Sequence, residues 1–129
     1  MPYQIEWEPN GLRCRVYGQA SITDVVQMFE EVASHPRFVN LRYRITDFSD
    51  VTSHQSSEGE VEDVVGLDFA HSLTNAQMLK AAVATDPSIL ILLNHWSKTN
   101  AHPERLGVFQ SLTEATEWVF KHPLMLKWN

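Results

Sequence analysis

The sequence predicts a single α/β domain built on a five-stranded mixed sheet with about four helices. Segments with strand-like alternation are followed by segments with helix-like periodicity through most of the chain, an order that favours right-handed crossovers between parallel strands. An Asn-Gly pair joins the first two alternating segments and predicts an antiparallel hairpin. The 129 residues, 43% of them hydrophobic, suit one well-buried core. We therefore expect one domain over residues 1–129, with the strands after the hairpin mostly parallel.

The charge and the cysteine content argue against several classes of protein. The net charge is −6, and an acidic chain lacks the general electrostatic footprint of a nucleic-acid-binding protein. Cys14 is the only cysteine, so an internal disulfide is excluded, and its place on an alternating strand predicts a small buried hydrophobe. No segment resembles a signal peptide or approaches the ~20 apolar residues that span a bilayer. We expect a cytoplasmic protein without a transmembrane segment.

The first two strands are expected to pair through a two-residue loop. Apolar side chains at positions 3, 5 and 7 and at 12, 14 and 16 alternate with polar ones. With Asn10 and Gly11 as the central loop residues, Glu8 would face Arg13 and Trp7 would face Cys14. A slip of one residue would expose the apolar set, so the sequence predicts this register.

Local signals then place a helix and a third strand. Ser21 caps the helix, and Asp24 brings a carboxylate to its positively polarised end. Its apolar stripe consists of Ile22, Val25, Val26, Phe29 and Val32. Pro36 closes this element, and the third strand is expected from Leu41 to Phe48.

Similar signals define the second half of the chain. Ser57 or a near neighbour starts a second helix, whose inward residues are predicted to be Val61, Val64, Val65 and Leu73. The fourth strand is expected from Met78 to Ala84, and Asp86-Pro87 then opens a third helix. The fifth strand runs from Leu106 to Phe109. A capping box from Ser111 to Glu114 begins the last helix, with Leu112, Ala115, Trp118 and Val119 on its apolar face.

This order of elements resembles the SpoIIAA-like family, relatives of the STAS domain of anti-sigma-factor antagonists. The resemblance also rests on Asp47-Phe48-Ser49-Asp50-Val51 at the third strand and on Ala84-Thr85-Asp86-Pro87 after the fourth. It covers nearly the whole chain. It implies a SpoIIAA/STAS-like, non-enzymatic regulatory domain that acts through a protein partner or as a homodimer.

The resemblance implies a switch region at the start of the second helix. In the sporulation antagonists this region is an Asp-Ser-Ser-Gly stretch, which matches Gln55-Ser56-Ser57-Glu58 here and places Ser56 on the phosphorylatable position. Glu58 replaces the glycine, and its carboxylate would repel a phosphate, so a helix cap is the alternative interpretation. The candidate switch or ligand region comprises Asp47, Ser49, Asp50, His54, Ser56 and Ser57.

The same region offers the main enzymatic alternative. Asp47 and Asp50 flank Ser49, where two carboxylates share a proton, bind a cation or shape a turn. A relay from His54 to Ser56 would suit hydrolytic or acid/base chemistry, but no G-x-S-x-G elbow surrounds the serine. The sequence also has no HExxH metal motif and no glycine-rich phosphate loop. We therefore expect no catalytic residue, no metal and no cofactor.

The third helix and the C-terminal tail are unusually apolar. Five consecutive aliphatic residues, Ile89 to Leu93, cannot all face one core, although a strand remains compatible with such a run. A dimer contact, a lipid-like ligand or a membrane surface would cover them. The candidate apolar residues are Ile89, Leu90, Leu92, Leu93, Trp96, Leu124, Leu126 and Trp128.

Some SpoIIAA-like relatives are also similar to lipid-carrier domains, whose helices open over an apolar cavity. This likeness implies an alternative function, a small carrier of a lipid-like or other apolar or anionic ligand, peripheral to the membrane. A candidate anion site consists of Arg13, Arg15, Arg42 and Arg44 on the second and third strands. The four guanidinium groups would share one sheet face if those strands were neighbours. The alternative is an open face on which these arginines pair with Glu6 and Glu8.

Overall fold

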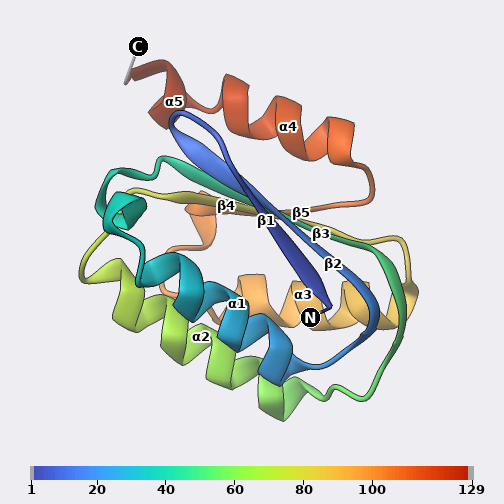
Figure 1. Cartoon of the computed structure of the whole chain (residues 1–129). Coiled ribbons are helices and arrows are strands. Elements are labelled where there is room, and N and C mark those ends of the chain that lie inside the picture. The colour runs from blue at the N-terminus through green and yellow to red at the C-terminus, as the bar shows by residue number, and fades with distance from the viewer. Residues whose placement is uncertain (1, 128–129) are drawn as a thin grey trace.

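The computed structural model describes residues 2–127 and confirms the predicted α/β architecture. One sheet runs through the middle of the molecule in the order β1-β2-β3-β4-β5 (Figure 1). Its strands are β1 (Tyr3–Trp7), β2 (Gly11–Ala20), β3 (Tyr43–His54), β4 (Leu79–Val83) and β5 (Leu106–Phe109). β1 pairs antiparallel with β2, and the three other pairings are parallel, as the sequence predicts.

The helices cover both faces of the sheet. Three of them, α1 (Ile22–Ala33), α2 (Glu58–Ser72) and α3 (Pro87–Thr99), lie on one face (Figure 1). The other face carries α4 (Leu112–Lys121) and α5 (Pro123–Lys127). Short 3₁₀ segments, η1 (Pro36–Asn40) and η2 (Pro103–Arg105), precede β3 and β5. Each face has its own apolar core, and the larger one lies under α1, α2 and α3.

The helix starts follow the predicted caps. The hydroxyls of Ser21, Ser57 and Ser111 accept hydrogen bonds from the backbone three residues later, and the Asp86 carboxylate accepts one from Ser88 N. The reciprocal bond of a capping box forms at Ser21 and Ser57. At Ser111 the hydroxyl instead donates to the Glu114 carboxylate, so half of the predicted box is present.

The hairpin register differs from the prediction by two residues. Trp7 pairs with Leu12 rather than Cys14, and Glu6 rather than Glu8 lies opposite Arg13. The central loop residues are therefore Pro9 and Asn10, bracketed by a 2.8 Å bond from Glu8 N to Gly11 O. A shift of two preserves the alternation, so the apolar set stays on one face.

Gly11 serves a purpose that the hairpin signal does not reveal. It is a strand residue without the positive φ that an Asn-Gly turn would require. A Cβ placed on it would lie 2.5 Å from ring atoms of Tyr43 on β3. The glycine therefore allows an aromatic ring to lie against the backbone of β2, while Pro9 suits the second position of the turn.

The third strand is longer than predicted. β3 starts at Tyr43 and continues to His54, well past Asp47, where its pairing with β4 ends. Its second half pairs with β2 as far as Ala20, with register irregularities near Tyr17 and Gly18. The segment from Asp47 to Val51 is thus extended strand, which contradicts the turn, one of the alternatives open for Asp47 and Asp50. The ten-residue length of β2 explains this, because β2 offers hydrogen-bonding partners beyond the end of β4.

Two predicted core positions are exposed. Leu73 is 78% exposed because α2 ends at Ser72 and the chain turns away from the core. Leu112 in the first turn of α4 is 42% exposed, whereas Ala115 and Val119 of the same stripe are fully buried. Cys14 is buried as predicted.

Candidate functional site

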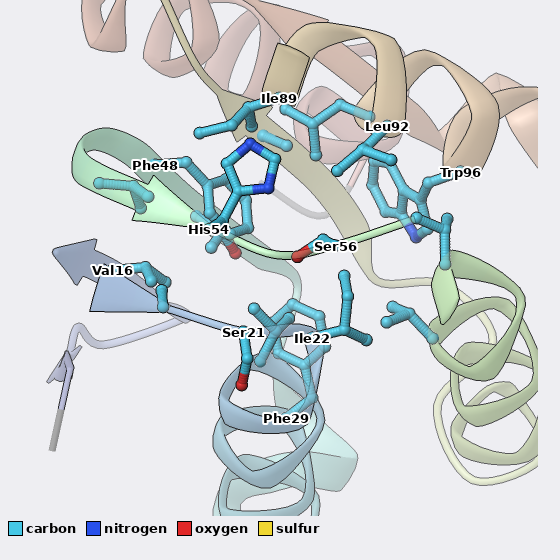
Figure 2. Close-up of a pocket in the computed structure, with 18 of the residues that line it drawn as sticks. Val16, Ser21, Ile22, Phe29, Phe48, His54, Ser56, Ile89, Leu92 and Trp96 are labelled. Atoms are coloured by element: carbon cyan, nitrogen blue, oxygen red, sulfur yellow. The ribbon is translucent and has the colours of Figure 1, made fainter. Parts of the chain in front are cut away.

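An apolar cavity lies between the sheet and the three helices α1, α2 and α3 (Figure 2). The room in it for the centres of water-sized spheres is about 80 Å³, and the cavity is partly open to solvent. Its walls come from β2, β3, β4, α1, α2 and α3, and the side chains that Figure 2 labels point into it from several of these elements. A concave apolar site with a few polar groups is typical of small-molecule binding.

The apolar run of α3 forms one wall of this cavity. Ile89, Leu92, Leu93 and Trp96 follow the i, i+3, i+4, i+7 spacing of a single helix face and all line the cavity. Leu90 packs against the larger core, and Ile91 is 59% exposed. The structure therefore confirms the helix, and most of the run faces the interior and the cavity.

The apolar tail lies elsewhere. Met125 and the half-buried Leu124 pack into the core under α4, on the face of the sheet opposite the cavity. Leu126 is 60% exposed. Trp128 lies outside the described residues. Leu124 and Leu126 therefore do not join the α3 residues in one site.

The mouth of the cavity carries two residues of the predicted switch region, His54 and Ser56 (Figure 2). His54 Nε2 lies 2.8 Å from the hydroxyl of Ser88, and that hydroxyl donates to Asp86 Oδ1 at 2.8 Å. Since the Ser88 proton is committed to Asp86, Nε2 of His54 must carry the proton that Ser88 accepts. The hydrogen bonds from Ser88 also lower the pKa of Asp86, which keeps this acceptor ionised.

The other ring nitrogen of His54 is left without a partner. Nδ1 is buried and has no hydrogen bond to any residue in 2–127. In the neutral ring with its proton on Nε2, Nδ1 carries a lone pair and acts as an acceptor. The mouth of the cavity therefore offers an acceptor for a hydroxyl or N–H group.

The remaining members of the predicted switch region have other roles. Asp47 Oδ1 accepts a 2.9 Å hydrogen bond from Ser49 N, and Asp50 forms a 2.7 Å ion pair with Arg15. Ser57 caps α2. His54 and Ser56 are thus the members that line the cavity.

A buried charged cluster lies at the inner end of the site. Asp68 of α2 is 1% exposed, and its Oδ1 lies 3.5 Å from Arg44 Nη2 and 3.4 Å from Lys80 Nζ. Its other oxygen, Oδ2, accepts a 2.7 Å hydrogen bond from Trp96 Nε1 and a 3.3 Å bond from Asn100. One carboxylate therefore joins α2 and α3 to the strands β3 and β4.

The cluster contains more positive than negative charge. Burial opposes ionisation of Asp68, but the charges of Arg44 and Lys80 outweigh it and lower the pKa of the carboxyl group. Burial also lowers the pKa of Lys80, and Asp68 opposes that shift. Two basic side chains, Arg44 and Lys80, therefore face one carboxylate.

Arg44 belongs to both the cluster and the cavity. It is 2% exposed, it lines the cavity, and its guanidinium carbon lies 3.5 Å from the centre of the Phe29 ring. Its Nε is buried and makes no hydrogen bond within the described part of the chain. An uncompensated N–H of a buried cation is a strong donor for an incoming anion.

The four predicted anion-site arginines do not share a face. In the parallel register Leu12 lies beside Arg44 and Arg13 beside Ile45, so Arg13 and Arg44 point to opposite faces. Arg13 pairs with Glu8 and donates to Thr116 on α4, a partial confirmation of the salt-bridge alternative. The predicted four-arginine site is therefore wrong.

The other two arginines also lie apart from the cavity. Arg15 is exposed, where it pairs with Asp50 and lies over the Tyr17 ring at 4.7 Å. Arg42 precedes β3, and its backbone bonds to Asn10 and Leu79. Of the four, Arg44 is the one that lines the cavity.

Asp68 and Lys80 were not predicted as site residues, although the sequence contains a signal for both. Asp68 follows Val61 and Val64 at the i, i+3, i+7 spacing, so it occupies a core position of α2. Lys80 interrupts the apolar run from Met78 to Ala84. Opposite charges at core positions of two elements predict a buried ion pair, because an unpaired charge there is costly.

No family model matches this chain, and no curated protein sequence is significantly similar to it. Within residues 2–127 no helix is long and apolar enough to cross a membrane. The same residues contain no group of three His, Cys, Asp or Glu side chains placed to hold a metal ion. The case for a function therefore rests on the cavity and its polar groups.

Proposed function

We propose that this protein binds a small molecule with an apolar body in the cavity between the sheet and helices α1, α2 and α3. The observation that carries the proposal is the cavity itself, whose lining is largely apolar and includes a few polar residues, among them the buried Arg44 and the half-buried His54. Protein interiors are close-packed, so an apolar cavity between a sheet and its helices is a candidate site for a small molecule.

The polar groups support binding more than catalysis. The proton of His54 Nε2 is directed to Ser88, not to Ser56. Asp47 accepts a hydrogen bond from the backbone of Ser49, and nothing links it to His54 among the described contacts. A nucleophile needs a base within hydrogen-bonding reach, and the Asp47, His54 and Ser56 arrangement does not supply one here. We therefore propose a carrier or sensor that leaves its ligand chemically unchanged.

Native mass spectrometry of the freshly purified protein tests the proposal directly. We expect a bound small molecule that is lost when the same sample is denatured, and its mass would indicate its chemical class. Calorimetric titration with decanoate and decanol provides a defined probe of the same site. Wild-type protein that carries no ligand and binds neither probe would contradict the proposal.

A pair of tryptophan variants on α3 locates the binding. Leu92→Trp enlarges a half-buried side chain that lines the cavity, so we expect it to abolish probe binding while the helix stays folded. Ile91→Trp makes a comparable change at the neighbouring residue, which is 59% exposed, and serves as the control. Equal affinities of the two variants would place the ligand outside the cavity.

A second candidate is the regulatory, self-associating module that the SpoIIAA-like resemblance implies. In its favour, Phe69 and Leu73 at the end of α2 and Ile91 on the neighbouring α3 are 58%, 78% and 59% exposed. If they form one contiguous apolar patch, such a patch is typical of an association surface. A dimer in the native mass spectrum that Phe69→Lys converts to a monomer would support this candidate.

The proposal extends to location. We propose a cytoplasmic protein that meets membranes peripherally, because a lipid-like ligand would be collected from a bilayer surface. Flotation with liposomes of neutral and anionic composition tests this. Protein that remains in the bottom fraction with both compositions would contradict the peripheral association.

A further inference from the structure

The chemistry of the inner end of the cavity indicates what kind of ligand the site accepts. Arg44 carries five N–H donors, and the Nη2 group faces Asp68. The Nε–H group is buried, belongs to a side chain that lines the cavity, and has no partner among residues 2–127. A buried cation with an unused donor is unfavourable in the empty site and favourable when an anion accepts from it.

The net positive charge of the buried cluster also favours an anionic ligand. Arg44 and Lys80 face the single carboxylate of Asp68, which is fully buried. Oδ2 of that carboxylate accepts hydrogen bonds from Trp96 and Asn100, whereas Oδ1 lies at ion-pair distance from the two cations without a hydrogen bond among residues 2–127. One additional negative charge would balance the cluster, whereas a dianion would replace the excess of positive charge by an excess of negative charge.

The rest of the lining excludes a compact polar anion. Phe29, Phe48 and Leu92 line the same cavity as Arg44, so a ligand that fills the cavity must have an apolar body. The mouth offers the acceptor His54 Nδ1 and the hydroxyl of Ser56, which suit a polar tail or water.

We propose that the ligand is an amphiphile with one carboxylate, and that this carboxylate accepts a hydrogen bond from Arg44 Nε while the apolar chain fills the cavity toward His54. The inference rests on the proposed function, because it specifies the ligand of the same cavity. Thr46, two residues along β3 on the same face as Arg44, also lines the cavity and is 2% exposed.

A matched ligand series on the wild-type protein tests the head group without any substitution. Decanoate, decanol and decyl phosphate share one chain length and differ in charge. At pH 7.4 we expect decanoate to bind at least about tenfold more tightly than decanol, the gain of a charge-assisted hydrogen bond in a buried site. Decyl phosphate should bind more weakly than decanoate, because its second charge is not compensated.

Two arginine variants identify the partner of the carboxylate. Arg44→Lys keeps the charge beside Asp68 but removes Nε, so we expect it to lose most of the preference for decanoate over decanol. Arg15→Lys makes the same change at an exposed arginine, and its preference should equal that of the wild type. His54→Gln should also retain the preference, because the head group lies at the other end of the cavity. Circular dichroism of each variant establishes that it is folded, and the wild-type series stands if Arg44→Lys does not fold.

The outcomes separate this inference from the proposed function. If decanol binds as tightly as decanoate, the inference of a carboxylate head group is wrong, although the cavity still binds apolar molecules. Decyl phosphate that binds most tightly would also overturn it, in favour of a phosphate head group. If the preference for decanoate over decanol is kept in Arg44→Lys but lost in His54→Gln, the head group binds near His54 and not near Arg44. Failure of both decanoate and decanol would overturn the proposed function itself.

Discussion

Trp96 on α3 and Asp68 on α2 are joined by a 2.7 Å hydrogen bond from the indole Nε1 to the carboxylate Oδ2. Both residues are almost fully buried, and Trp96 also lines the cavity. Asp68 also forms ion pairs with Arg44 and Lys80 of the sheet. The hydrogen bond therefore connects the cavity wall to the charged cluster. The position of α3 over the cavity therefore depends on a polar contact as well as on apolar packing.

Removal of the Asp68 charge should be strongly destabilising. Asp68→Asn leaves two buried cations without a counter-ion, and we expect a loss of about 3–5 kcal/mol in the free energy of unfolding. Urea denaturation followed by circular dichroism measures it. Asp63→Asn, an exposed change on the same helix, should stay within about 0.5 kcal/mol of the wild type. Similar midpoints for the two variants would contradict the structural importance of the cluster.

The cluster also predicts acid sensitivity. The pKa of Asp68 is lower in the folded protein than its ordinary value of 3.8, so the unfolded chain binds more protons between those two values. This contribution is fully present above the unfolded pKa, and it is lost as pH falls through the folded pKa. Unfolding free energies measured from pH 6 down to pH 2 should show this loss. A profile in Asp68→Asn as steep as that of the wild type would contradict it.

A second step is expected at higher pH from His71. Its ring lies 5.6 Å from the Phe38 ring, edge to face, and burial together with the charge of Arg44 lowers its pKa below 6.5. The folded state therefore favours the neutral ring. The contribution is full above pH 6.5 and is lost as pH falls through the folded pKa. His71→Gln should flatten this part of the stability profile, and an unchanged slope would assign it to another group.

Two glycines should respond to alanine in opposite directions. A Cβ on Gly11 would lie 2.5 Å from the Tyr43 ring, so Gly11→Ala should cost about 1–3 kcal/mol through overpacking. Gly66 is exposed within α2, and a Cβ there meets nothing within 4 Å. Gly66→Ala should therefore stabilise the protein by up to about 1 kcal/mol through its helix propensity. Thermal unfolding of both variants is the measurement, and a neutral Gly11→Ala would contradict the close approach.

The proton position on His54 is open to direct observation. The bonds from His54 to Ser88 and from Ser88 to Asp86 require the neutral ring to carry its proton on Nε2. Long-range ¹H–¹⁵N spectra should show that tautomer for His54, and Ser88→Ala should weaken the preference. The exposed His102 serves as an internal comparison. A His54 ring protonated mainly on Nδ1 would contradict this arrangement.

Features encoded by neighbours in the sequence were predicted well. The caps at Ser21, Ser57, Asp86 and Ser111 each depend on residues two or three positions away, and all four are confirmed. The bounds of β5 agree with the prediction for the same reason.

Features that depend on distant partners were not predicted. The hairpin register reflects the Tyr43 ring against Gly11, and the length of β3 reflects the length of β2, which local patterns do not encode. Ser56 was predicted as a site residue from a resemblance, and His54 because it lies beside the candidate serines. The cluster of Asp68, Arg44 and Lys80 was missed because it forms only when α2 packs on β3 and β4.

The rate at which the single cysteine is alkylated can report how often the folded protein opens. Cys14 lies on β2, paired with Ile5 on one side and Thr46 on the other, and burial raises the pKa of its thiol to about 12. The folded chain thus holds almost no reactive thiolate at neutral pH. Alkylation requires an opening that exposes Cys14 from the core between the sheet and the helices, so its rate reports how often this core opens. A ligand bound between the sheet and its helices would lower the alkylation rate of Cys14. The size of this decrease would measure the occupancy of the cavity, with no label on the protein or on the ligand.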